Sequence, residues 1–250
     1  MQNNDLDKPV YVVLGATGGV GSVLCQSLAE KGAHVLAAAR NQEKLELLAN
    51  KTGISPFLID ATNPNSIDAA IKSALELYQK IDGVANCIGS ILLKPAHITS
   101  DNDWATTLEN NLTTAFQTVR SATRVMMKTG GSIVLVSSAA AQIGLANHEA
   151  IAATKAGIIG LALSAAASYA SKNIRVNCVA PGLIRTPLTE RITNNEVALK
   201  SSLSMHALGR IGEASDVASA IEWLLDKKQN WITGQVIAID GGLSRVKTRN

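Results

Sequence analysis

Short apolar runs alternate with longer segments of helical period along most of the chain, and this alternation limits the folds that the sequence can adopt. Most of the runs are continuously apolar, which is typical of parallel strands covered by helices on both faces of a sheet. We predict strands at residues 10–15, 33–39, 55–60, 82–89, 131–138, 175–182 and 235–242. The expected fold class is therefore α/β, with a doubly wound parallel sheet of about seven strands.

Helical signals fill the segments between these strands. We predict helices at residues 20–32, 43–53, 64–80, about 102–128, 147–171 and 215–225. Gly32 and Gly53 fit the ends of the first two helices, and Pro64 fits the start of the third.

No composition shift, linker or internal repeat divides the chain. We therefore expect one domain over residues 1–250, with a core at about 9–243. The polar stretch 186–205 lies between recognisable elements, and we consider it a candidate mobile lid over a substrate.

Composition excludes several classes of protein. With 46% hydrophobic and 17% charged residues the chain has the composition of a globular protein. A net charge of +3 is too small to favour nucleic acid, and the basic segment 245–250 is expected to be solvated. We find no apolar run of about 18 residues, and the polar residues 1–8 do not resemble a signal peptide. We expect a cytoplasmic protein without a membrane span.

The cysteines predict neither a disulfide framework nor a metal site. Cys25, Cys87 and Cys178 are odd in number, far apart and in apolar surroundings. We expect buried free thiols. No cysteine and histidine spacing suggests metal ligands, so we expect no metal.

The first predicted strand runs directly into GATGGVG, a glycine cluster at a strand-to-helix turn. Such a turn lets the backbone approach a pyrophosphate, and the helix N-terminus supplies free N–H groups and a positive dipole end. Glycine is also common in ordinary turns, so the evidence comes from the position of the cluster after the first strand. The candidate phosphate-binding residues are Gly15, Thr17, Gly18, Gly19, Val20 and Gly21.

The glycine spacing and several later motifs resemble the short-chain dehydrogenases/reductases. The glycines match the G-x-x-x-G-x-G of that family, and NCIG at 86–89 resembles its N-N-A-G turn. PGLIRT at 181–186 resembles the P-G-x-x-x-T that borders the nicotinamide, and residues 208–242 contain a segment similar to the family's closing signature. The resemblance covers about 9–243 and implies a Rossmann-like fold that binds a nicotinamide dinucleotide. The chain departs from the pattern at Leu14, where the family usually has threonine.

The end of the second strand favours NADP (NADPH) over NAD. Relatives that prefer NAD resemble one another in carrying Asp at the position of Ala39, and Arg40 follows it here. A guanidinium is suited to a 2′-phosphate, although Arg40 could also be a solvated residue at a strand end. The resemblance assigns further cofactor contacts to Asp60, Ala61, Asn86, Gly89, Lys155, Pro181, Gly182, Ile184 and Thr186.

The resemblance also assigns a catalytic set in which one member is missing. In the family a serine holds the substrate oxygen, a tyrosine transfers the proton, and a lysine four residues later contacts the nicotinamide ribose. Asn111, Ser138 and Lys155 match these motifs by spacing better than the adjacent Asn110 and Ser137 do. The tyrosine position is occupied by isoleucine, at residue 151.

An isoleucine at this position has no dissociable proton, whereas general acid catalysis needs one within hydrogen-bond reach. His148 precedes Ile151 by three residues and is a candidate substitute, because histidine titrates near neutrality. A solvated or capping role is the simpler interpretation of His148. Glu149 and Thr154 are weaker candidates, and Lys155 itself could also donate.

Three functional hypotheses follow from these motifs. The first is an NADP-binding oxidoreductase resembling the family, with non-standard chemistry because Ile151 replaces the tyrosine, acting on an unknown small molecule. The second is a catalytically silent, nucleotide-binding pseudoenzyme that acts as a sensor or partner subunit. The third is a nucleotide site that has lost its function; Leu14 and the altered NCIG suggest it, whereas Arg40, Asp60 and Lys155 are evidence against it.

Small residues in the segment 152–170 would permit close helix approach between subunits. Related proteins pair this helix, so the resemblance implies a homodimer or homotetramer. The same small residues also suit packing onto the sheet within one subunit.

Overall fold

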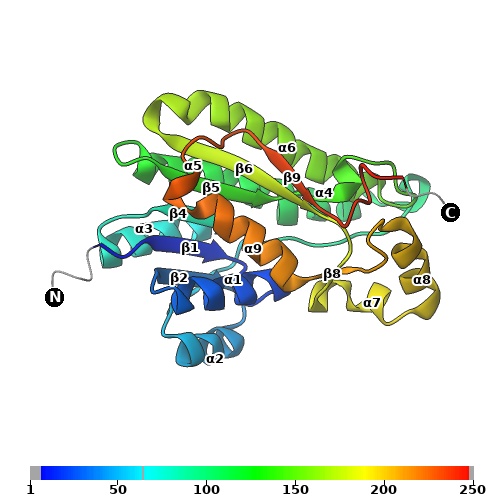
Figure 1. The fold of residues 1–250 in the computed structure, drawn as a ribbon, viewed down its shortest axis with the longest axis horizontal. Coiled ribbons are helices and arrows are strands. Elements are labelled where there is room, and N and C mark those ends of the chain that lie inside the picture. Colours follow the sequence, from blue (N-terminus) through cyan, green and yellow to red (C-terminus); the bar gives the residue numbers. More distant parts are fainter. Residues whose placement is uncertain (1–6, 64, 248–250) are drawn as a thin grey trace.

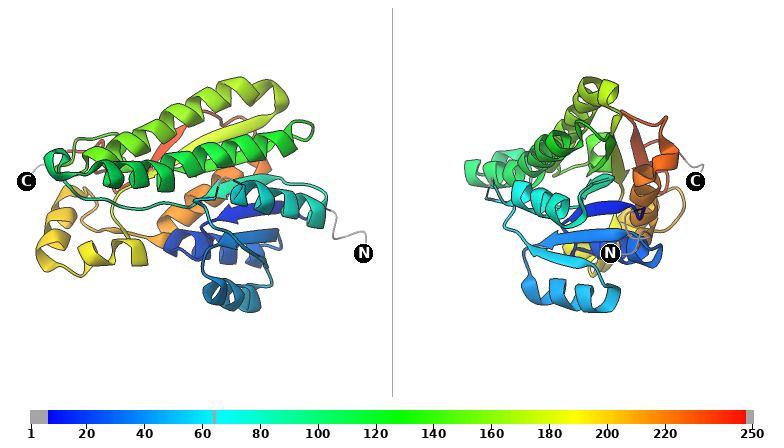
Figure 2. Two further views of the ribbon diagram at one scale, coloured as in Figure 1. Left: turned by 180° about the vertical axis from the view of Figure 1, so that it is seen from behind. Right: turned by 90° about the vertical axis from the view of Figure 1, so that its left-hand side faces the viewer.

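The computed structural model describes residues 7–63 and 65–247 of the chain. Residues 1–6 of the polar N-terminal segment, Pro64 and residues 248–250 of the basic tail lie outside the described residues. The described chain forms a parallel seven-stranded sheet in the order β3-β2-β1-β4-β5-β6-β9, covered by helices on both faces (Figures 1 and 2). The predicted single-domain α/β fold of the Rossmann type is therefore confirmed.

All seven predicted strands are present, and they are mostly shorter at their ends than predicted. They are β1 (Val10–Leu14), β2 (His34–Ala39), β3 (Ser55–Leu58), β4 (Gly83–Asn86), β5 (Gly131–Val136), β6 (Ile174–Pro181) and β9 (Val236–Ile239). A separate pair joins β7 (Ile184–Arg185) and β8 (Gly212–Glu213). The α-helices are α1 (Gly19–Glu30), α2 (Gln42–Thr52), α3 (Ser66–Tyr78), α4 (Asp101–Leu108), α5 (Thr114–Met126), α6 (Glu149–Tyr169), α7 (Glu190–Thr193), α8 (Glu196–Met205) and α9 (Ala214–Leu225).

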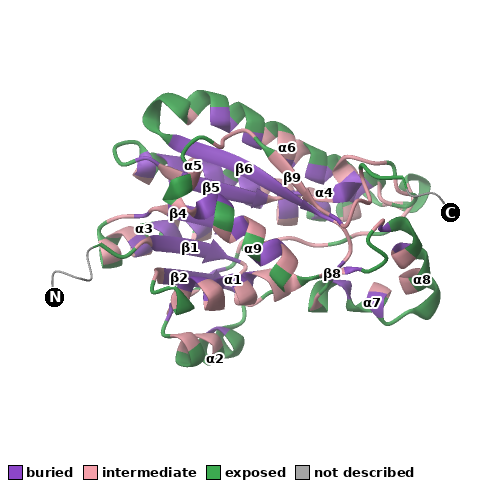
Figure 3. Cartoon of the chain, viewed as in Figure 1, coloured by how far each residue is buried: buried purple, intermediate pink, exposed green. Residues whose placement is uncertain are grey.

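Each face of the sheet carries its own hydrophobic layer. Most strands between the layers are buried, purple in Figure 3, whereas β9 is of intermediate exposure. Val12 packs with buried residues of α3, α5 and α6 on one face, and Val13 packs with those of α1, α2 and α9 on the other. Successive strand side chains point to opposite faces, so a continuously apolar strand supplies both layers.

The long predicted helix at 102–128 differs from prediction in its middle. The structure places a π-helical turn, Glu109–Thr113, between α4 and α5. A π-turn inserts one extra residue per turn and commonly marks a functional site. Here it contains Asn111, one of the candidate catalytic residues.

The segment 186–205 is mostly helical, which its sequence pattern did not predict. It forms the 3₁₀ turn Pro187–Thr189, then α7 and α8, beyond the carboxyl ends of the strands (Figure 1). The Asn195 side chain accepts from the Ala198 amide and so caps α8. These helices are short and polar, and they give no clear apolar period in the sequence.

One described helix passes for a membrane span by length and composition alone, although the sequence has no uninterrupted apolar run of about 18 residues. Within the described chain, Glu149–Lys172 has the required length and a mean hydropathy of 1.6. However, α6 packs against β6 and α5, and 44% of the apolar window is buried in the protein. Inward-facing alanines and isoleucines of a core helix give the same composition as a membrane span.

The three cysteines are free. Cys25 and Cys178 are buried as predicted, whereas Cys87 is half-buried. Burial raises the pKa of the Cys87 and Cys178 thiols to about 12. Both are therefore protonated and unreactive near neutral pH. Among residues 7–63 and 65–247 no cluster of three or more histidine, cysteine or acidic side chains could hold a metal.

Candidate dinucleotide site

The glycine turn between β1 and α1 forms a cradle lined by backbone. Gly15 has a φ of +79°, and a Cβ on it would lie 2.8 Å from the carbonyl carbon of Cys87. The Gly18 amide donates to the Gly15 carbonyl, and α1 begins at Gly19. The first helical turn contains no acidic side chain. A pyrophosphate fits such a cradle, because the helix N-terminus attracts anions and the glycines carry no side chain of their own.

Thr186 lies against this cradle from a distant part of the chain. A Cβ on Gly19 would lie 2.6 Å from the Thr186 Cγ2 atom. Thr186 follows Ile184 in β7, which continues from the Pro181–Gly182 turn at the end of β6. The structure thus brings the PGLIRT motif and the glycine turn together. Thr17 and Val20, also in the turn, are half-buried.

Arg40 and Asp60 follow neighbouring strands, since Ala39 of β2 pairs with Leu58 of β3. Both side chains are exposed. Hydrogen bonds from Thr62, and to a smaller extent the charge of Arg40, hold the pKa of the Asp60 carboxyl below its usual value. The Arg40 guanidinium is open to solvent, at the same edge of the sheet as the glycine turn. Ala61 is half-buried next to Asp60.

Asn86 shapes the turn after β4. Its Nδ2 donates to the Thr118 hydroxyl at 3.0 Å and its Oδ1 accepts from the Ile88 amide at 2.9 Å. The side-chain amide of the buried Asn86 is therefore hydrogen-bonded within the protein through both its nitrogen and its oxygen. A Cβ on Gly89 would lie 3.0 Å from Asn111 Oδ1 and 3.3 Å from Lys155 Nζ. Gly89 lets these two side chains approach the turn.

Asn111 is held by two residues that the sequence motifs did not indicate. Its Oδ1 accepts from the Ser90 amide, and its Nδ2 donates to the Ser90 hydroxyl and to the Thr107 carbonyl. These contacts fix the π-turn against the loop that follows β4. Ser90 directly follows the NCIG motif, but no residue spacing in the sequence indicates this pairing.

Lys155 is buried, with 7% of its surface exposed. Its Nζ donates to the Val136 carbonyl at 3.0 Å. Burial lowers the pKa of the Lys155 amine to about 8, against a smaller opposing effect of the Cys178 and Cys87 thiols. A substantial share of this lysine is therefore neutral at mildly alkaline pH.

The two adjacent serines have different surroundings. The Ser137 hydroxyl is buried and donates to the Lys155 carbonyl at 2.8 Å. The Ser138 hydroxyl is half-buried and accepts from the Ala140 amide at 3.1 Å. Because that bond uses only a lone pair, Ser138 keeps its own proton for donation. This geometry favours Ser138 as the residue that faces a substrate.

Ile151 lies one helical turn before Lys155 and is 4% exposed. His148 occupies the N-cap position of α6, and its Nδ1 donates to the Ala146 carbonyl at 2.7 Å. The Thr154 hydroxyl is buried and donates to the Ala150 carbonyl, and Glu149 is exposed. The face of α6 that carries Lys155 therefore presents an aliphatic side chain one turn earlier.

Comparison with known proteins identifies relatives of the whole chain. Residues 15–244 match a family model described as enoyl-(acyl carrier protein) reductase. The chain is 34% identical to 3-oxoacyl-(acyl-carrier-protein) reductase of Thermotoga maritima, over 95% of this chain and 98% of that protein. A short-chain type dehydrogenase/reductase from Mycobacterium ulcerans has a similar structure, with a TM-score of 0.91 and 30% identity over 94% of this chain and 90% of that one.

A further similar structure is that of ElxO with NADP bound, with a TM-score of 0.88 and 28% identity. The similarity covers 94% of this chain and 98% of ElxO. An ElxO variant in which phenylalanine replaces a tyrosine is known with NADPH bound.

Proposed function

Because the chain belongs to the short-chain dehydrogenase/reductase family, we propose that it is an NADP-binding oxidoreductase whose proton transfer does not use a tyrosine. The family binds nicotinamide dinucleotides. The observation that carries the proposal is the pair Ile151 and Lys155: the buried lysine is present, and the residue one turn before it is aliphatic.

The residues of this chain fit the dinucleotide. The cradle between β1 and α1 has no room for a Cβ at Gly15, which meets the backbone of Cys87, or at Gly19, which meets the Thr186 side chain. We assign the site to Gly15, Thr17, Gly18, Gly19, Val20, Gly21, Arg40, Asp60, Ala61, Asn86, Gly89, Lys155, Pro181, Gly182, Ile184 and Thr186. The ElxO variant with phenylalanine in place of a tyrosine supports the expectation that NADPH binding does not need every tyrosine hydroxyl.

Bound NADPH would supply a hydride. Lys155 would hold the ribose, and the Ser138 hydroxyl would hold the oxygen of the substrate. Asn111 would keep the loop after β4 in place through Ser90. Ile151 excludes water and supplies no proton.

Losing a general acid typically costs about 10² to 10⁴ in rate, whereas orientation of the reactants can supply about 7–11 kcal/mol. Reduction is therefore still feasible for substrates that need no alkoxide protonation at this position. Activated alkenes, imines and quinones belong to this class, and ordinary ketones do not. The description of the matching family model, an enoyl reductase, names an activated alkene and supports this choice.

The second candidate is a silent, nucleotide-binding pseudoenzyme, which the same aliphatic Ile151 favours. The two candidates share cofactor binding and differ in turnover. The test is NADPH oxidation with a panel of enones, imines, quinones and ketones, using the parent and His148→Ala. We expect turnover with the first three classes that His148→Ala leaves unchanged. No turnover with any substrate, despite NADPH binding, would exclude the oxidoreductase and favour the pseudoenzyme.

Arg40 should determine the preference for NADP over NAD. Charge-assisted hydrogen bonds contribute about 1.5–3 kcal/mol, so Arg40→Ala should weaken NADPH binding by about 10- to 100-fold and NADH binding by little. Calorimetric titration of both cofactors measures this. Lys44→Ala, another exposed cation shortly after β2, is the control. Equal losses for NADPH and NADH would contradict the phosphate role of Arg40.

We further propose a cytoplasmic protein with one domain over residues 1–250 and a core at 9–243, in which 186–205 acts as the substrate lid. Its partners are the dinucleotide, a small-molecule substrate and copies of itself, as a homodimer or homotetramer. Neither nucleic acid nor a membrane is among the proposed partners, since the net charge is only +3 and α6 is used in the core.

A further inference from the structure

His206 is a buried imidazole at the end of α8, 4% exposed, with both ring nitrogens in hydrogen bonds. Its Nδ1 lies 2.6 Å from the Ser202 carbonyl, and its Nε2 accepts from the Leu183 amide at 3.2 Å. A carbonyl only accepts, so Nδ1 must carry the ring proton. Nε2 must then be unprotonated. The contacts select a neutral ring in one tautomer.

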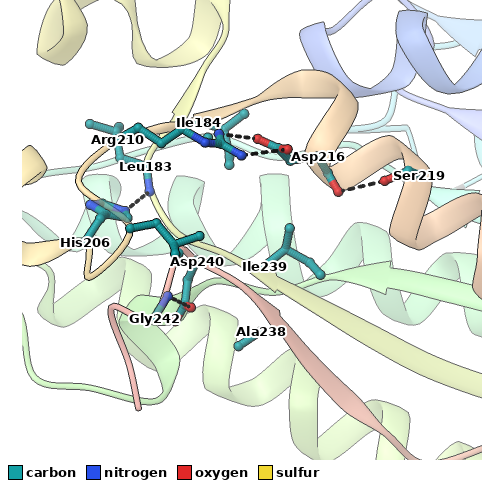
Figure 4. Close-up of a pocket in the computed structure, with 13 residues that line it drawn as sticks. Leu183, Ile184, His206, Arg210, Asp216, Ser219, Ala238, Ile239, Asp240 and Gly242 are labelled. Carbon is teal, nitrogen blue, oxygen red and sulfur yellow. Dashed lines mark hydrogen bonds and ion pairs between the residues drawn. The ribbon is translucent and has the colours of Figure 1, made fainter. Parts of the chain in front are cut away.

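These two bonds connect the 186–205 segment to the turn at the end of β6. Leu183 follows the Pro181–Gly182 turn, and its carbonyl accepts from the Gly212 amide at 2.9 Å. The turn packs closely on the ring, because a Cβ on Gly182 would lie 2.6 Å from His206 Nε2. Figure 4 shows the ring pointing toward Leu183. His206 thus joins α8 directly to the turn that borders the candidate site.

We propose that His206 is a proton-sensitive clamp: the neutral ring holds the segment 186–205 on the turn 181–183, and a second ring proton releases it. A doubly protonated ring carries N–H groups on both nitrogens. Its Nε2–H would face the Leu183 N–H, donor against donor, and the contact would be lost. This inference rests on the proposed function only in assigning the turn to the border of the cofactor.

The charges around the ring offer the protonated form another partner. Asp240 is 6% exposed and flanks the same glycine, since a Cβ on Gly182 would lie 3.2 Å from Asp240 Cβ. Burial raises the pKa of the Asp240 carboxyl, but hydrogen bonds from Ser244 and Gly242 outweigh this effect and hold that pKa below its usual value. Asp240 is therefore an ionised acceptor near neutral pH.

The remaining charged groups of the same cavity neutralise each other. Arg210 forms two hydrogen bonds with Asp216, at 2.7 and 3.0 Å, on the other side of the cavity (Figure 4). The cavity has a volume of about 390 Å³ and is lined by His206, Asp240 and this pair. A protonated ring that leaves Leu183 would turn toward Asp240 across this cavity. The neutral and the protonated ring would then adopt two discrete arrangements, as a switch requires.

Hydrogen exchange of the cofactor-free protein tests the clamp. The measurement is amide exchange in peptides covering residues 183–206, followed by mass spectrometry between pH 5.5 and 8, for the parent and His206→Gln. The glutamine oxygen can accept from Leu183 but takes up no proton in this range, so the variant corrects for the intrinsic pH dependence of exchange. We expect the exchange rate of the parent, relative to His206→Gln, to rise at least tenfold on acidification. A constant ratio would overturn the proposal.

Asp240→Asn provides a second test if His206→Gln fails to fold. Loss of the carboxylate removes the alternative partner of the protonated ring. Release of the segment 186–205 on acidification should therefore begin at a lower pH in Asp240→Asn than in the parent. Release at the same pH in both proteins would overturn the two-arrangement clamp. Because no cofactor is present, a failure of NADPH binding in the Arg40 experiment leaves these results interpretable.

Discussion

Ile151 and Lys155 share one face of α6, one turn apart, and both are buried. Among the described residues, the lysine amine donates one hydrogen bond, to the Val136 carbonyl, and pairs with no carboxylate. Its environment is therefore set by burial and not by an ion pair. At the residue scale, the chemistry of the candidate site depends on which protons and hydrogen bonds these two side chains can offer a substrate.

Ile151→Tyr tests whether the rest of the site is competent. Adding a phenol one turn before Lys155 should create or raise ketone reductase activity by about 10²-fold or more, because a general acid contributes that much. Steady-state kinetics with NADPH measures the effect. Ile151→Phe is the matched control, with the ring but no hydroxyl, and it should stay inactive. If Ile151→Tyr binds NADPH and remains inert, the placement of Asn111, Ser138 and Lys155 is incorrect.

The buried Lys155 predicts a pH-dependent stability. Its pKa falls from 10.5 to about 8 on folding, so between these values the unfolded chain binds more protons. Its contribution to stability therefore rises with pH in this window, and below pH 8 the folded protein carries the full penalty. Lys155→Met should be more stable than the parent at pH 7 by up to about 3 kcal/mol.

This advantage of Lys155→Met should shrink as the pH rises from 8 toward 10. Urea unfolding of both proteins at pH 7, 8 and 9 measures the difference. The buried thiols of Cys87 and Cys178 have raised pKa values in both proteins, so their effect largely cancels in the difference. A difference that is independent of pH would show that Lys155 keeps its ordinary pKa.

At the element scale, the β1-to-α1 turn and α1 form one unit with the end of β7. The positive φ of Gly15 turns the chain, and the missing side chain of Gly19 admits Thr186. The π-turn around Asn111 is likewise held by a distant segment, because Asn111 accepts a hydrogen bond from the Ser90 amide in the loop after β4. Each element is shaped by contacts with a segment distant in sequence.

Gly15→Ala and Gly32→Ala separate conformational strain from steric overlap. Both glycines have φ near +80°, but only at Gly15 would an added Cβ have atoms within 4 Å, in Cys87 and Ile88. Gly32→Ala should cost about 1–2 kcal/mol from φ alone. Gly15→Ala should cost about 1–3 kcal/mol more from overlap, and should also weaken NADPH binding. Chemical denaturation and cofactor titration measure both effects; equal destabilisation would contradict the close packing at Gly15.

At the scale of the whole molecule, α6 has two different faces. Its inner face belongs to the core, and its outer face exposes Ala153, Ala156, Gly160 and Ala167 beside Leu163, which is 49% exposed. Small exposed residues at helical spacing allow a second helix to approach closely. This face supports the proposed pairing of subunits through α6.

Ala156→Arg should convert the proposed oligomer into monomers, because a long charged side chain prevents close helix approach. Sedimentation velocity measures the state of assembly, and circular dichroism checks that the fold persists. Ala69→Arg, at an exposed alanine of α3, is the control and should leave the assembly unchanged. Assembly of Ala156→Arg like that of the parent would place the interface elsewhere.

Much of the fold was predictable from the sequence for local reasons. Seven apolar runs indicate buried parallel strands because each run by itself must be covered on both faces. The glycines of the first turn indicate a phosphate cradle because the lack of a side chain is a property of the residue itself. The absence of a tyrosine at residue 151 is likewise evident from the order of the residues.

The tertiary structure alone decided the remaining features. The contacts of Thr186 with Gly19, of Ser90 with Asn111 and of His206 with Leu183 join segments far apart in the chain. The spacing of residues in the sequence does not predict such contacts, because they depend on how the helices pack on the sheet. The lowered pKa of Lys155 has the same origin, since burial is a property of the assembled core and not of the lysine.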